Sequence, residues 1–115
     1  MRLKSAIWVA AYVRRCNGVG AFAAVRRRGS EEAGAIFIKL NRLDGTAELF
    51  GPAPQAVFDE AHPSERAFMR CLGQGPVAEQ LVEERLNREL RFDPDVWIVE
   101  VEDRNGRNLL DTLVG

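Results

Sequence analysis

The chain has 115 residues, of which 46% are hydrophobic and 29% are charged, and its formal net charge is −1. These values are typical of one globular domain, which we expect over residues 1–115, and they exclude disordered, collagen-like and disulfide-rich classes. Cys16 and Cys71 set no disulfide framework, and we expect two free thiols in a cytoplasmic protein.

The first predicted element is a helix from Ser5, the expected N-cap, to a stop at Asn17-Gly18. Its apolar run, residues 6–13, imitates a signal peptide. However, two arginines follow where a small-residue cleavage site would stand, and a membrane span needs about twenty apolar residues, so we expect neither export nor a membrane partner. Because Trp8, Tyr12 and other apolar residues surround most of the helix, we expect the sheet or a second copy to cover it. A homodimer could form through this helix or through a sheet edge.

Three strand-like runs follow between residues 20 and 50: "GAFAAVRRR", "GAIFIKLNR" and "TAELF". Asp44-Gly45 before the third run is a hairpin signal, and together the runs predict a three-stranded antiparallel meander. Alternation in the second run places Ile36, Ile38 and Leu40 on one face, and Phe37, Lys39 and Asn41 on the other.

A proline-rich loop over residues 51–63 comes next, with Phe58 as its expected anchor in the core, and residues 67–72 can form a short strand. Pro76 is expected to open a helix that runs to about Leu90. Residues 96–102 form the last long strand, and Asn105-Gly106 should turn residues 107–111 back against it. The sequence therefore predicts an α+β fold: a mainly antiparallel sheet of five or six strands with two helices packed on it, in the order α-β-β-β-β-α-β-β.

Five acidic residues crowd into the stretch "RFDPDVWIVEVEDRNGR" from Arg91 to Arg107. Alternation points Trp97, Val99 and Val101 toward the core and Val96, Ile98, Glu100 and Glu102 toward the other face. The other three acids, Asp93, Asp95 and Asp103, lie in turns, where Asp bonds its own backbone.

The pair Glu100 and Glu102, joined by Glu48 from another strand, is the candidate site of this stretch. One interpretation pairs these glutamates with the arginines of "AVRRRG" across neighbouring strands. The alternative is a site for Mg²⁺ or Ca²⁺, which takes several oxygen ligands. The arrangement resembles a nuclease core, but Asp103 stands where such a site has a lysine, and this argues against hydrolysis.

Other catalytic groups are sparse. The only histidine is His62, which excludes a two-histidine metal site, and neither Cys16 nor Ser64 has a spacing that supports a role as nucleophile beside it. Gly18 and Gly20 precede a strand instead of following one, and therefore do not form a dinucleotide-binding turn. We expect no cofactor and no catalytic residue.

Charge is unevenly distributed along the chain. Residues 1–42 carry nine Lys or Arg against two Glu, whereas residues 43–115 carry seven against fifteen Asp or Glu. Arg26 and Arg28, on one face at the end of a strand, are the candidate phosphate contacts for a nucleic acid. The acidic second half argues against a dominant nucleic-acid surface without excluding one.

Three segments resemble a family of small bacterial proteins catalogued as a domain of unknown function, number fourteen ninety-one in that series. These are "RLKSAIWVAAYVRR", "GAIFIKLNRLDGTAELFGPAP" and "RFDPDVWIVEVEDRNGR", and the Asp-Pro-Asp, Trp and Glu-Asp-Arg string is the most specific part. The resemblance implies a single-domain bacterial protein without assigned activity, and it supplies no catalytic residues. We therefore expect a non-enzymatic interaction or binding module. The alternative is a metal-dependent or other weak-signature enzyme that uses Glu100 and Glu102.

Overall fold

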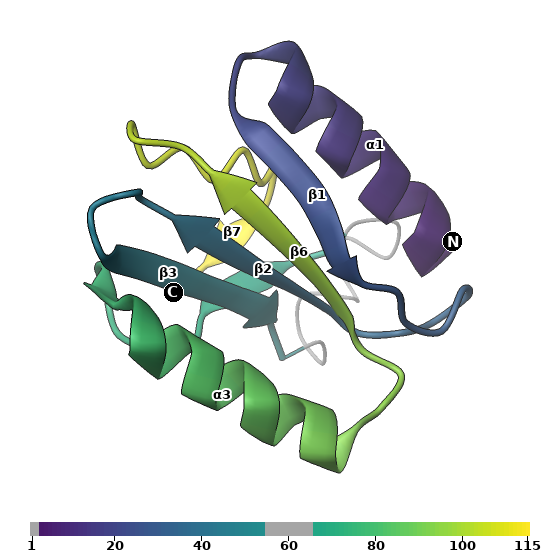
Figure 1. Cartoon of the computed structure of the whole chain (residues 1–115). Helices are drawn as coiled ribbons and strands as arrows, with labels where there is room; N and C mark the ends of the chain where they lie inside the picture. Colours follow the sequence, from purple (N-terminus) through teal and green to yellow (C-terminus); the bar gives the residue numbers. More distant parts are fainter. Residues whose placement is uncertain (1–2, 55–65) are drawn as a thin grey trace.

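The structure is a computed structural model that describes residues 3–54 and 66–115. Two helices and seven strands follow one another in these ranges (Figure 1). They are α1 (Ser5–Gly18), β1 (Phe22–Arg27), β2 (Ile36–Asn41), β3 (Thr46–Pro52), β4 (Phe68–Arg70), β5 (Val77–Ala78), α3 (Glu79–Phe92), β6 (Trp97–Glu102) and β7 (Leu113–Val114). The α+β class is confirmed.

The sheet is mixed, and the prediction of a mainly antiparallel sheet of five or six strands in the stated order was wrong. Six strands lie in the order β1-β6-β2-β3-β4-β7, and β5 pairs with β3. The β2–β6 and β4–β7 pairs are parallel, while the other pairs are antiparallel. The predicted β2–β3 hairpin is present, but β6 inserts between β1 and β2, so residues 20–50 do not form a meander.

The segment between β1 and β2 explains this insertion. It packs under the turn before β6, where Ser30 N–H donates to Asp95 O at 2.9 Å, instead of forming a hairpin turn. A Cβ on Gly29 would lie 2.2 Å from Asp95 O, so only glycine permits this close approach. The same segment caps α1, because the carbonyls of Glu31 and Glu32 accept the first helical N–H groups. Ser5 is therefore not the N-cap.

The α1 side of the sheet carries the larger hydrophobic cluster. The predicted faces are confirmed, because Ile36, Ile38 and Leu40 of β2 and Trp97, Val99 and Val101 of β6 all lie in this cluster with buried residues of α1. On the opposite side, α3 packs Val82 and Leu86 against Phe37, Leu49 and Ile98. The two helices lie on opposite sides of the sheet (Figure 1).

Two predicted ends differ from the structure. The second helix begins at Glu79 and not at Pro76, because residues 77 and 78 pair with β3 as β5 and Glu79 N–H donates to Gly45 O. The chain after Asn105-Gly106 does not return along β6. Arg107 bonds back to Asp103, and the following residues cross α1 to reach β4.

The aromatic residues of α1 are covered by the same chain. Tyr12 is buried and donates its hydroxyl to Asn108 O, while Trp8 stacks on Tyr12 and contacts Phe68. Packing within one chain thus covers both aromatic residues of this helix but leaves Ile7 51% exposed, and the homodimer stays a prediction. Within residues 3–54 and 66–115, neither helix has the length and apolarity to cross a membrane.

Candidate functional site

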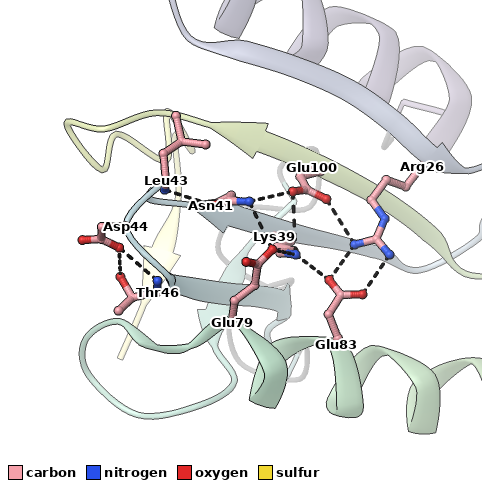
Figure 2. A network of polar contacts seen from close by, with 9 residues as sticks. All are labelled: Arg26, Lys39, Asn41, Leu43, Asp44, Thr46, Glu79, Glu83 and Glu100. Carbon is pink, nitrogen blue, oxygen red and sulfur yellow. Dashed lines mark hydrogen bonds and ion pairs between the residues drawn. The ribbon is translucent and has the colours of Figure 1, made fainter.

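A buried lysine lies at the centre of a polar network between the sheet and α3 (Figure 2). Lys39 points from β2 toward α3, and only 3% of its side chain is exposed. Its Nζ donates to Glu79 Oε2 at 2.6 Å and to Glu83 Oε2 at 2.5 Å, and it lies 3.7 Å from Glu100 Oε2. Asn41 donates its amide to Glu79 and Glu100. One helix turn separates the two helical glutamates, so both reach the same lysine.

Arg26 closes the network from β1. The register of β1 on β6 shifts between Val25 and Arg27, which places Arg26 in a β-bulge. A bulge redirects a side chain locally, and here the guanidinium turns toward α3. It forms a bidentate ion pair with the Glu83 carboxylate, with N···O distances of 2.8 and 2.9 Å (Figure 2). Its Nη1 also donates to Glu100 Oε1 at 3.2 Å. The predicted pairing of a strand arginine with Glu100 is therefore present.

These pairings change the protonation of the network. Hydrogen bonds from Arg26, opposed by desolvation and assisted by Lys39, lower the pKa of Glu83 to about 2. Burial by itself would lower the pKa of Lys39, but its hydrogen bonds to Glu79 and Glu83 outweigh burial and raise it. Glu83 and Lys39 therefore keep their charges at neutral pH, and neither has a pKa near 7 that would suit general acid–base chemistry.

Beside this network lies a hollow on the α3 side of β1 and β6, which we call the β1 hollow. It has a volume of about 210 Å³ and is lined by Phe22, Ala24, Arg26, Glu100 and Glu102. The α3 helix packs on Phe37, Leu49 and Ile98 in the middle of the sheet and leaves the Phe22 end of β1 open. Phe22 consequently has 61% of its surface exposed on this face of the sheet.

The outer edge of β1 is protected. The side-chain amide of Asn17 accepts a hydrogen bond from Ala23 N–H and donates one to Ala23 O, as a neighbouring strand would. Together with the bulge at Arg26, this blocks the pairing of a further strand over much of the edge. The face of β1 is therefore more available to a partner than its edge.

The three candidate metal ligands do not converge. Glu48 lies opposite Leu40 on the α1 side, whereas Glu100 lies opposite Lys39 on the α3 side. Glu48 instead lies between Arg42 and Arg70, at 3.7 and 3.6 Å. Over residues 3–54 and 66–115, no three His, Cys, Asp or Glu side chains are grouped so that they could hold a metal ion. A metal bound by Glu100 and Glu102 remains a prediction, and the first of these is already paired with cations.

The candidate phosphate contacts point in different directions. Arg26 is bound to two carboxylates, and the guanidinium of Arg28 lies over the Trp97 ring, 5.0 Å from its centroid. Phosphate binding would compete with both interactions, so these two arginines do not form a preorganised clamp. Nucleic-acid binding through them stays a prediction that this geometry weakens.

The remaining candidates have structural roles or lie outside the described residues. Cys16 is fully buried, and burial raises the pKa of its thiol, which disfavours a nucleophilic thiolate. His62, Ser64 and Phe58 lie outside the described residues. Two of the three turn acids behave as predicted, because Asp93 accepts from Asp95 N–H and Asp103 accepts from the backbone of Asn105 and Arg107. The side chain of Asp95 makes no such bond to the described residues.

Sequence reasoning missed Lys39, Glu79 and Glu83. The signal was present: Lys39 interrupts an otherwise apolar strand, and the two glutamates recur at i and i+4 on the second helix. A lysine within a buried strand requires carboxylate partners, and one helix face supplied two of them.

The fold and the site describe a small α+β protein with a mixed sheet, a polar network whose two cations are paired with carboxylates, and no recognised catalytic constellation among the described residues. The sequence profile of a protein family of unknown function, DUF1491, matches residues 3–111. The chain therefore belongs to the DUF1491 family.

Solved structures agree with this assignment. A crystal structure of a DUF1491 family protein from Caulobacter crescentus CB15 is 38% identical, with a TM-score of 0.81 and coverage of 100% of both chains. The solution structure of Atu0922 from A. tumefaciens is 44% identical, with a TM-score of 0.74, and the match covers 89% of this chain and 86% of that one. The search of curated proteins gave no match. The family and these relatives carry no assigned function.

Proposed function

We propose that this DUF1491 protein is a non-enzymatic interaction module of the cytoplasm, which docks a segment of a partner protein in the β1 hollow. The single observation that carries the proposal is the exposure of Phe22 on an open sheet face beside a hollow of about 210 Å³. Large exposed apolar residues around a concavity are typical of protein-binding surfaces. The free thiols Cys16 and Cys71 support a reducing compartment.

The polar network beside the hollow supports binding more than catalysis. Lys39 and Arg26 are each held by two or more carboxylates, so the network is rigid and both of its cations are paired. Catalytic acids and bases instead need a pKa near the working pH and access to substrate. We therefore propose that the network has a structural role. It holds α3 on the sheet, and its residues Arg26 and Glu100 form one wall of the hollow.

Selection of peptides from a random phage-displayed library against the immobilised protein tests this proposal. Selected peptides should bind the wild-type protein and Leu81→Ser equally, and should bind Phe22→Ser at least about tenfold more weakly, which corresponds to about 1.4 kcal/mol. Leu81 is the matched control because it is a large apolar residue, 50% exposed, on α3 and outside the hollow. Peptides that bind all three proteins equally, or a selection that recovers none, would contradict the proposal.

A further inference from the structure

The charge around the β1 hollow is unbalanced toward the negative. Four carboxylates, those of Glu79, Glu83, Glu100 and Glu102, lie around the hollow or in the adjoining network, against the two cations Arg26 and Lys39. This leaves an excess of two negative charges beside an apolar surface. The excess repels acidic partners and attracts basic ones.

The carboxylate of Glu102 can still accept hydrogen bonds from a partner. Glu100, its neighbour on β6, already accepts hydrogen bonds from Arg26 and Asn41. Within residues 3–54 and 66–115, the side-chain carboxylate of Glu102 has no hydrogen bond or ion pair, although the residue is half-buried and lines the hollow. It lies directly opposite Phe22 on β1. An apolar ring and an uncommitted carboxylate are thus presented side by side.

From these observations we propose that the β1 hollow binds an extended basic and apolar segment of a partner protein, in which an arginine pairs with Glu102 and an apolar side chain covers Phe22 and Ala24. Arginine fits this site because its planar guanidinium can bond a carboxylate with two N–H groups while it stacks on an aromatic ring. The proposal rests on the proposed function, whose docking site it specifies.

The test uses two synthetic, fluorescently labelled peptides, Leu-Arg-Leu-Arg-Leu and its analogue with citrulline in place of both arginines, titrated by anisotropy at low salt. Citrulline keeps the shape of arginine and removes the charge. The arginine peptide should bind at least about threefold more tightly than the citrulline peptide, as expected for a partly exposed ion pair, and the difference should vanish at high salt. Glu102→Gln should remove the preference for arginine, whereas Glu84→Gln, an exposed glutamate of α3 outside the hollow, should keep it.

The outcomes separate this inference from the proposed function. Two results would refute the basic partner while leaving the proposed docking function intact. Either Glu102→Gln leaves the preference for arginine unchanged, or both peptides bind equally and only Phe22→Ser weakens their binding. If neither peptide binds in a Phe22-dependent manner, the inference fails, and the library selection decides the proposed function independently. If light scattering shows a dimer that Phe22→Ser converts to a monomer, the occupant is a second copy of the chain, and the inference is overturned.

Discussion

Replacing Glu83 by glutamine tests the polar network most sharply, because this carboxylate accepts hydrogen bonds from both Arg26 and Lys39. Glutamine keeps the shape of the side chain and removes its charge. The pKa of Glu83 falls from 4.5 to about 2 in the folded protein. A shift of that size would correspond to about 3 kcal/mol of stability if it were fully expressed. Because 35% of the side chain is exposed, solvent screening reduces our expectation to about 1 to 2 kcal/mol.

The sign of the pH dependence follows from the direction of the shift. Since the folded pKa lies below the unfolded one, the stabilisation is fully present above pH 4.5 and is lost as the pH falls toward about 2. Urea unfolding at several pH values should therefore show Glu83→Gln less stable than wild type at pH 7, with the two curves converging in acid. Glu84→Gln, next to it on the exposed side of α3, should stay within about 0.5 kcal/mol of wild type at pH 7. Equal stability of Glu83→Gln and wild type at pH 7, or a loss that does not change with pH, would refute this reasoning.

Three further predictions concern metal binding, the sheet edge and the β1–β2 connection. Mg²⁺ or Mn²⁺ should leave the melting temperature unchanged, whereas an increase of several degrees that Glu100→Gln and Glu102→Gln abolish would establish a metal site. Asn17→Ala should remove the protection of the β1 edge, cost about 1 kcal/mol in urea unfolding and promote association in light scattering; a fully monomeric variant would show that the amide does not protect the edge. Gly29→Ala should lower the melting temperature by several degrees in a thermal scan, because its Cβ would lie 2.2 Å from Asp95 O, and unchanged melting would contradict that close packing.

Local alternation predicted the faces of the strands but not the order of the strands in the sheet. Ile38 and Val99 were correctly assigned to the core because their side chains alternate with those of residues on the opposite face. Alternation could not predict that β6 inserts between β1 and β2, because the alternation of side chains within a strand does not depend on which strand is its neighbour in the sheet. The segment between the first two predicted strands was expected to connect neighbours in a meander, but Gly29 in it packs against Asp95, a residue far away in sequence.

The candidate site was predicted only in part for the same reason. The pairing of Arg26 with Glu100 follows from strands that carry opposite charges, and it was anticipated as a cross-strand pair. The contact of Arg26 with Glu83 depends on a bulge and on the placement of α3, which are tertiary features without a local signature. The convergence of Glu48 with Glu100 was wrong, because Glu48 lies beside Leu40 and Glu100 beside Lys39, and these consecutive residues of β2 point to opposite faces of the sheet.

Mapping the docking surface by NMR tests the central claim most directly. The measurement is a titration of ¹⁵N-labelled wild-type protein with the peptide Leu-Arg-Leu-Arg-Leu at low salt, followed through the backbone amide resonances. We predict that the amides of Phe22, Ala24, Glu100 and Glu102 shift together along one saturation curve, while those of α1 do not move. Shifts centred on α1 or around Arg28 would contradict the assignment of the β1 hollow as the binding site, and a spectrum unchanged at millimolar peptide would contradict the inferred basic partner.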